Sequence, residues 1–275
     1  RCQRMREDYD EVVAEYYNEE ASTFEQRAEE NHVLMWLRDD FREITLSFKP
    51  RKLLEIGYGP GLDMTWFADR EETEIVHGVD ISPEFHEIVK GKALKRNDSK
   101  VIPHIGSAED IVGVIGERGV DTVFVYFGAL NTSKDLKKVA AGISKVLEPG
   151  GIAILTFVNR WYLFDILWNA LLLRPRKSLA RLGEIWTGYS PTRSLPSRCF
   201  SAREIRRSFH PYLDLAEQRG YCILHPAWYR KHWAPKGSIR SRLLRRIDYF
   251  LQWTPFWNFG EYSLYVFENP NMDSK

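Results

Sequence analysis

The sequence has 275 residues, of which 44% are hydrophobic and 13% aromatic, enough to fill a buried core and too many for a disordered chain. The length predicts one core with sizeable additions. The longest strongly apolar run, 161–173, has 13 residues and is too short to span a bilayer. The charged residues 1–8 lack the apolar stretch of a signal peptide.

The three cysteines, at positions 2, 199 and 222, are widely spaced and odd in number. That arrangement is typical neither of a disulfide framework nor of a zinc site. We therefore expect a protein of the reducing cytoplasm with no bound metal.

Charge is unevenly distributed along the chain, although the net charge is only +1. Residues 160–246 hold 18 Lys and Arg against 5 Asp and Glu, a net +13, so the remainder carries −12. Seven of the nine tryptophans follow residue 160. The second half is thus basic and aromatic, a composition that suits an interface.

Apolar side chains recur at three- and four-residue spacing through residues 1–50, which predicts a helical N-terminal cap that ends at Lys49-Pro50. Residues 51–158 then alternate short apolar runs with amphipathic segments, one of which opens at Ser82-Pro83. The runs predict strands buried on both faces, at 53–56, 75–79, 101–105, 121–126 and 152–157. Such alternation predicts an α/β fold with a parallel sheet, right-handed crossovers and a ligand at the carboxyl ends of the strands.

The alternation stops after residue 158. We interpret residues 159–210 as a lid or substrate insertion, and residues 211–275 as the final strands of the core. Strands are predicted near 213–224 and at 262–267, with a basic aromatic loop at 225–260 between them.

Three glycines at alternate positions, Gly57, Gly59 and Gly61, directly follow the first predicted strand. They permit positive φ and let backbone amides approach a ligand that a Cβ would exclude, which indicates a nucleotide-like ligand. A dinucleotide fingerprint would have its third glycine one residue later, so a dinucleotide is disfavoured. Asp80 ends the second strand, where a carboxylate can accept hydrogen bonds from ribose hydroxyls, and Ile81 can cover an adenine face. The alternative, that Asp80 caps the next helix, is weaker because Ser82 can fill that role.

From about residue 50 to 158 the chain resembles the class I S-adenosylmethionine-dependent methyltransferases, small-molecule type. Glu55 and the three glycines match the family's first motif, Asp80 matches its second-strand acid, and residues 147–151 match its LxPGG turn. The resemblance implies a Rossmann-like, doubly wound, mostly parallel sheet of seven strands with an antiparallel last strand. It also implies S-adenosyl-L-methionine as cofactor and S-adenosyl-L-homocysteine as product.

The resemblance also implies a set of cofactor-binding residues. Ser107 stands where the family carries an acid, so adenine contact is expected from Ser107, Ala108 or Glu109, and Phe127-Gly128 is similar to the segment that lines the methionine portion. The implied set is Glu55, Gly57, Tyr58, Gly59, Gly61, Asp80, Ile81, Ser107, Ala108, Glu109, Phe127 and Gly128.

The family reaction is direct in-line displacement, in which alignment can supply about 7–11 kcal/mol. Candidate catalytic residues are Asn131, whose amide can hydrogen-bond an acceptor, His225 as a base, and Tyr17 as a lid tyrosine. His210 and Tyr189 are alternative bases. Each of these residues has a structural alternative, such as helix packing for Tyr17.

Residues 161–181 and 240–257 place basic beside apolar side chains, which suits peripheral contact with a membrane. The alternative is a lid whose apolar side chains pack on the core. Three functions stay open. We favour methylation of a small molecule that is apolar, anionic or lipid-like. The alternatives are methylation of RNA, with nucleic acid the less favoured substrate, and cofactor binding by a regulatory protein without turnover.

Overall fold

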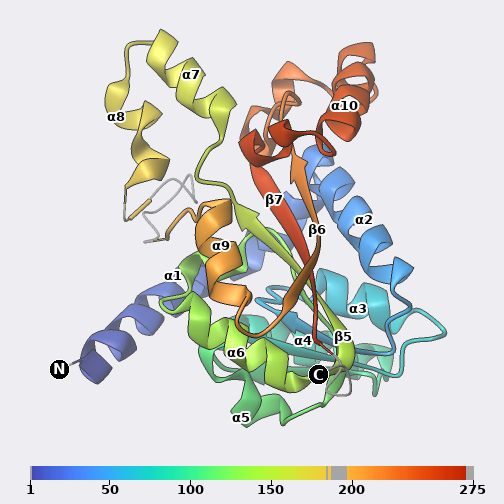
Figure 1. The fold of residues 1–275 in the computed structure, drawn as a ribbon. Coiled ribbons are helices and arrows are strands. Elements are labelled where there is room, and N and C mark those ends of the chain that lie inside the picture. The colour runs from blue at the N-terminus through green and yellow to red at the C-terminus, as the bar shows by residue number, and fades with distance from the viewer. Residues whose placement is uncertain (1, 184, 187–196, 271–275) are drawn as a thin grey trace.

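The computed structural model describes residues 2–183, 185–186 and 197–270 (Figure 1). Its centre is one sheet of seven strands in the order β3-β2-β1-β4-β5-β7-β6. β1 to β5 pair in parallel, and β7 lies antiparallel between β5 and β6, which confirms the fold class expected from the sequence. The strands are β1 (Lys52–Ile56), β2 (Ile75–Asp80), β3 (Val101–Ile105), β4 (Val120–Val125), β5 (Leu147–Val158), β6 (Asp214–Tyr221) and β7 (Tyr262–Glu268).

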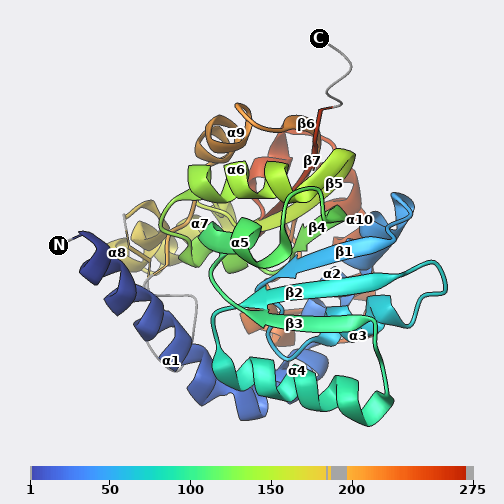
Figure 2. The same cartoon turned by 90° about the horizontal axis from the view of Figure 1, so that it is seen from below.

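Helices cover both faces of the sheet (Figure 2). One face carries α2 (His32–Ser47), α3 (Leu62–Ala68) and α4 (Pro83–Arg96), and the other carries α5 (Ile111–Ile115), α6 (Leu136–Val146) and α9 (Ala202–Phe209). Alternate strand residues enter opposite cores, so Leu53 packs in the first and Leu54 in the second. Burial on both faces explains why these strands are continuous apolar runs.

The N-terminal cap is two helices, α1 (Cys2–Glu29) and α2, separated at Asn31. The Asn31 side chain accepts hydrogen bonds from the backbone N–H groups of Val33 and Leu34 and so caps α2. α1 lies beside α4, where Lys92 bonds Glu25 at 2.6 Å (Figure 2). The cap is therefore attached to the core next to the loop that follows β1.

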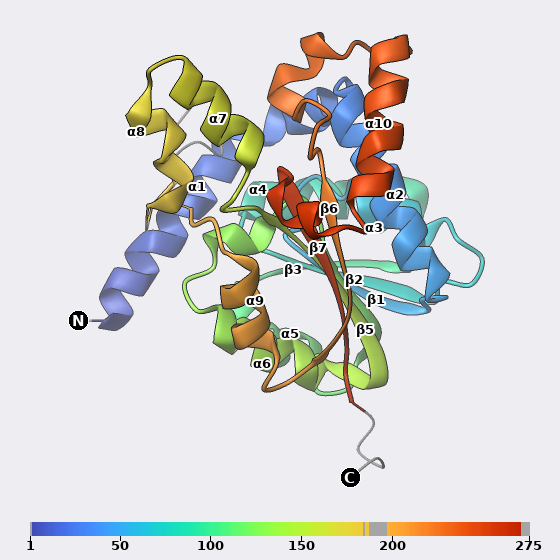
Figure 3. The same ribbon diagram turned by 45° about the horizontal axis from the view of Figure 1, so that its top comes forward.

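The later segments extend from the carboxyl edge of the parallel strands. β5 leads into α7 (Leu163–Leu171), α8 (Pro175–Ser178) and the short helix η3 (Ala180–Leu182). β6 leads into η4 (Trp228–Trp233), α10 (Ile239–Leu251) and η5 (Pro255–Phe259). Both groups rise at the same end of the molecule (Figures 1 and 3). No helix in the described ranges is both long and apolar enough to cross a membrane.

We expect Gly220→Ala to destabilise the fold. A Cβ on this β6 glycine would lie 2.0 Å from the Trp257 carbonyl oxygen, a backbone atom that cannot turn aside, so overpacking should cost about 1–3 kcal/mol or more. Gly91→Ala in α4 is the matched control, because its Cβ meets nothing within 4 Å and helix propensity favours alanine by about 1 kcal/mol. Denaturant unfolding of both variants measures the change in the free energy of unfolding. A Gly220→Ala protein as stable as wild type would contradict the packing of β6 on η5.

Candidate functional site

The loop between β1 and α3 contains three glycines in the left-handed region, with φ of 75° at Gly57, 52° at Gly59 and 75° at Gly61. A Cβ on Gly57 would meet Ala129 at 2.5 Å, and one on Gly61 would meet Val89 at 2.6 Å. A Cβ on Gly59 would meet nothing within 4 Å. The outer two glycines therefore permit close packing, whereas Gly59 presents bare backbone to open space.

Asp80, at the carboxyl end of β2, faces that loop. Its carboxylate accepts the Gly59 N–H at 2.9 Å and the Ser82 N–H at 3.0 Å. Burial raises the pKa of Asp80, and these backbone hydrogen bonds oppose the rise. Ser82 caps α4 by accepting the Phe85 N–H at 3.2 Å, so the cap is separate from the carboxylate.

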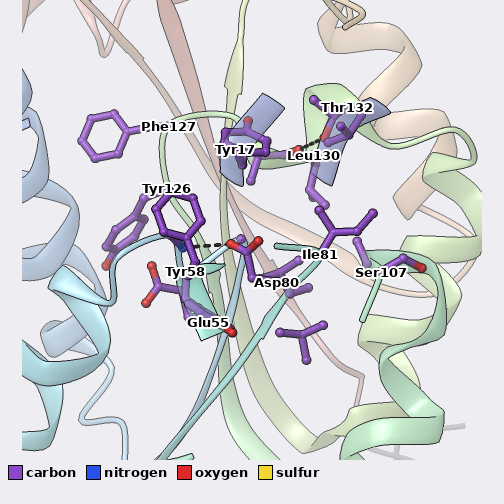
Figure 4. A pocket seen from close by; sticks show the side chains of 18 of the residues that line it. Tyr17, Glu55, Tyr58, Asp80, Ile81, Ser107, Tyr126, Phe127, Leu130 and Thr132 are labelled. Carbon is purple, nitrogen blue, oxygen red and sulfur yellow. Dashed lines mark hydrogen bonds between the residues drawn. The ribbon is translucent and has the colours of Figure 1, made fainter. Parts of the chain in front are cut away.

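A cavity opens above these groups at the carboxyl ends of β1 and β4, where the strand order reverses (Figure 4). All the implied cofactor-binding residues except Gly61 and Gly128 line this glycine-loop cavity. Further lining side chains include Val13, Tyr17, Phe24, Arg38, Asp63, Phe85, Tyr126, Leu130 and Thr132. Glu109 also lines the cavity, but its carboxylate already accepts hydrogen bonds from the Ser133 hydroxyl and the Lys134 N–H.

Two buried charged groups in the wall of this cavity have unused hydrogen-bonding atoms. Glu55 Oε2 and Arg38 Nε have no partner among the described residues. Burial raises the pKa of Glu55 well above its usual range, the Asp63 carboxylate adds to the rise, and the Arg38 guanidinium opposes it. A buried polar atom without a partner is costly, so this end of the cavity is suited to a ligand with groups of both charges.

A second, larger cavity of about 450 Å³ adjoins the first, and we call it the aromatic cavity. Its walls are α1, α2, the carboxyl end of β5, Trp186, η4 and the start of β7. The lining side chains include Tyr16, Tyr17, Phe24, Leu34, Arg38, Phe127, Val158, Trp186, Trp228, Tyr229 and Tyr262, with Arg27, Glu30, Lys231, His232 and Glu261 among the polar ones.

Four side chains line both cavities and form what we call the shared wall: Tyr17, Phe24, Arg38 and Phe127. The Arg38 guanidinium lies over the Phe127 ring, 4.7 Å from its centroid. Phe127 has a φ of 55°, which is rare for a bulky residue and typical of functional sites. Any group transfer between ligands in the two cavities has to occur at this wall.

Of the candidate catalytic residues that lie within the described ranges, only Tyr17 lines the glycine-loop cavity or the aromatic cavity. The Asn131 amide accepts the Val158 N–H at 2.9 Å and donates to the carbonyls of Val158 at 3.2 Å and Arg198 at 2.6 Å. Both of its N–H donors are thus in use, and it lines neither cavity. Its position ties the loop after β4 to the end of β5.

His225 is buried beside α10, away from both cavities. Its ring bonds the Pro226 carbonyl at 2.9 Å and the Ser241 hydroxyl at 3.2 Å, and burial lowers its pKa to about 4. His210 is exposed at the end of α9 and lines neither cavity. Tyr189 lies outside the described residues.

Sequence reasoning missed Arg38, Asp63 and Phe24, all of which line the glycine-loop cavity. A signal for Arg38 existed, because it follows Leu34 by one helical turn on the apolar face of α2, where a charged residue is unexpected. Asp63 gave no such signal, since it looks like an ordinary acid in the first turn of a helix.

Residues 53–151 match the family described as "Methyltransferase domain". No curated protein sequence matches the chain. Among solved structures, the fold is similar to that of the [4+2]-cyclase SpnF, with a TM-score of 0.63 and 16% identity over 94% of this chain and 95% of that one. It is similar to geranyl diphosphate C-methyltransferase from Streptomyces coelicolor A3(2), solved with Mg²⁺, geranyl diphosphate and S-adenosyl-L-homocysteine, with a TM-score of 0.61 and 15% identity over 95% and 97%.

The fold is also similar to that of one chain in the complex between the Haloferax volcanii Trm112 methyltransferase activator and a methyltransferase. The TM-score is 0.59, with 16% identity over 93% of this chain and 98% of that one. At these identities the likeness shows the fold, and the acceptor has to be argued from the cavities of this chain.

Asn131→Ala is expected to lower the free energy of unfolding by about 2–4 kcal/mol, because it leaves a buried N–H and two carbonyls without their partner. Thermal and denaturant unfolding measure the change. Normal stability combined with lost turnover would contradict a positioning role and return Asn131 to the catalytic candidates.

Proposed function

We propose that this chain is a class I S-adenosylmethionine-dependent methyltransferase and that it methylates an apolar small molecule held in the aromatic cavity. The match of residues 53–151 to a methyltransferase domain and the likeness in fold to a methyltransferase support the first part of the proposal. The observation that carries the proposal is the shared wall, at which the glycine-loop cavity and the aromatic cavity adjoin. A cavity of about 450 Å³ is in the range of small-molecule sites, which favours such an acceptor over RNA.

The residues of the glycine-loop cavity fit the cofactor. An ammonium and a carboxylate at its amino-acid end would complement the unpartnered atoms of Glu55 and Arg38. Asp80 would accept hydrogen bonds from the ribose hydroxyls, and bare backbone at Gly59 would admit the nucleoside. Ile81 and Ala108, from the ends of β2 and β3, would cover the adenine.

When bound, the cofactor supplies a methyl group on a positively charged sulfur, open to direct in-line displacement. The chain's own contribution is alignment and exclusion of water. The rings of Tyr17, Phe24 and Phe127 close the space between the cavities with apolar surface, and Asp63 holds Arg38 beside them. No proton carrier is needed if the acceptor's nucleophile is already deprotonated. A carbon–carbon double bond as nucleophile would leave a carbocation, which then has to lose a proton to a base.

The aromatic cavity favours an acceptor with an apolar body and an anionic group. Aromatic rings form its interior. The exposed residues at its rim are Arg27, Lys231 and His232 together with one carboxylate, Glu30, so basic side chains outnumber acidic ones there. The buried Glu261 carboxylate in its wall is neutralised by Arg181, at 2.7 Å, so it does not repel an anion. Geranyl diphosphate, bound by the Streptomyces coelicolor neighbour, has this combination of an apolar chain and an anionic group.

We expect Gly59→Val to abolish measurable cofactor binding, because its side chain would occupy the space now open above the loop. Asp80→Ala should weaken binding about ten- to hundredfold through lost charge-assisted hydrogen bonds. Gly116→Val is the matched control, since Gly116 also has positive φ and open space around its Cβ but lines neither cavity. Titration calorimetry with S-adenosylmethionine and S-adenosylhomocysteine measures these affinities. Wild-type affinity in the Gly59→Val protein would exclude the glycine-loop cavity as the cofactor site.

Trp228→Ala should raise KM for the acceptor about tenfold while cofactor affinity stays unchanged, because Trp228 lines only the aromatic cavity. Trp161→Ala is the control, because Trp161 is 41% exposed and lines neither cavity. The assay follows S-adenosylhomocysteine formation with a panel of prenyl diphosphates, alkyl phenols and fatty acids. A cofactor-binding protein that transfers no methyl group to any of them would overturn the acceptor class.

A further inference from the structure

Two helical arms stand apart at the same end of the molecule (Figures 1 and 3). The first arm comprises α7 and α8, residues 163–178, and the second arm is α10, residues 239–251. Each arm buries one face against the protein and leaves another apolar face uncovered.

On the first arm the buried face of α7 rests on η4. Trp168 packs edge-on against Trp233, with ring centroids 4.8 Å apart, and Arg230 donates to Asp165 at 2.6 Å. The opposite face carries leucines at four-residue spacing, Leu163, Leu167 and Leu171, followed by Leu173. Leu171 is 75% exposed and Leu173 88% exposed, so packing within the described chain does not account for them.

The second arm likewise has one face that contacts the protein and one apolar face that is exposed. Its inner face holds Asp248, which accepts backbone N–H groups of residues 223–225, and Ser241, which bonds His225. Its outer face presents Leu243, 56% exposed, and Phe250, 71% exposed, with Trp253 just beyond the helix at 55%. Large apolar side chains on both arms thus face solvent at the same end of the molecule.

Unpaired cations accompany these apolar faces. Arg174, Arg176 and Lys177 belong to the tip of the first arm, and Arg240, Arg242 and Arg246 belong to the second. All six are exposed, and none forms an ion pair within the part of the chain that the structure describes. Ion pairing within the described chain therefore does not account for these six charges.

We propose that the two arms together form a docking face for an anionic lipid bilayer. Exposed leucine and aromatic side chains would enter the interfacial region, while the arginines and the lysine meet anionic head groups. The commitment to an anionic lipid surface rests on charge complementarity: apolar side chains and unpaired cations alternate on the same helices. A neutral lipid surface would offer these six cations no anionic partner.

Docking would bring the aromatic cavity to the bilayer. η4 joins the first arm through Trp233 and Arg230, is followed directly by the second arm, and lines the cavity with Trp228, Lys231 and His232. An apolar acceptor would then reach the cavity from the membrane without crossing water. This consequence rests on the proposed function, whereas docking itself does not.

The test is co-sedimentation of the full chain with vesicles of phosphatidylcholine alone and of phosphatidylcholine with 30% phosphatidylglycerol. We expect binding to the anionic vesicles at least about tenfold stronger, and weaker in about 0.5 M salt because charges are then screened within a few ångströms. Leu167→Glu with Leu171→Glu, and separately Leu243→Glu with Phe250→Glu, should each reduce it about tenfold or more. Leu94→Glu on α4 is the matched control, since Leu94 is 74% exposed but belongs to neither arm.

Two results would overturn the proposal: vesicle binding by the glutamate variants equal to wild type, or wild-type protein that ignores anionic vesicles but binds single-stranded RNA. Methyl transfer to a soluble acceptor without vesicles is measured in the same variants, and it should be unchanged because no substituted residue lines a cavity. Lost vesicle binding with intact transfer supports docking, while absent transfer in every protein contradicts only the proposed acceptor.

Discussion

The carboxylate of Asp63 lies between two arginines of α2, Arg38 and Arg42, and all three side chains are almost completely withdrawn from water. Removing one member of such a group costs about 3–5 kcal/mol, because the remaining charge stays buried without compensation. The ion pairs join the N-terminal cap to α3, the helix that follows the glycine loop. They also hold Arg38 in the shared wall. Both cavities therefore depend on this contact, since α1 and α2 form one side of each.

The glycine-loop cavity, where we propose that the cofactor binds, is assembled from strand ends. Glu55, Asp80 and Phe127 stand at or just beyond the carboxyl ends of β1, β2 and β4, which the parallel sheet brings to one edge. The glycine loop adds backbone where side chains would interfere, and only Gly59 leaves that backbone open. The aromatic cavity, the proposed acceptor site, has a different origin, because its walls come from the cap and from the segments after β5. The two cavities are thus built from different parts of the fold, so the residues of one can change without changing the other.

The basic and aromatic residues of the second half are divided between two environments. Trp186, Trp228 and Tyr229 line the aromatic cavity, whereas Leu171 and Phe250 on the arms face solvent. The composition left two interpretations open, a lid on the core and a surface for lipid. The rings in the aromatic cavity support the first, and the exposed faces of the arms are the ones for which we propose the second. A helix presents several faces at once, and its composition does not say which one is covered.

The sequence by itself determined the strands, their parallel alternation with helices and the glycine loop, because these follow from patterns only a few residues long. It also indicated Glu55 and Asp80, whose places are defined by the ends of the strands they terminate. Only the tertiary structure decided that Asn131 and His225 are hydrogen-bonded away from the cavities, and that Arg38 lies between them. Each of those outcomes depends on a partner beyond the reach of a local pattern, from 16 residues away for His225 and Ser241 to 67 for Asn131 and Arg198.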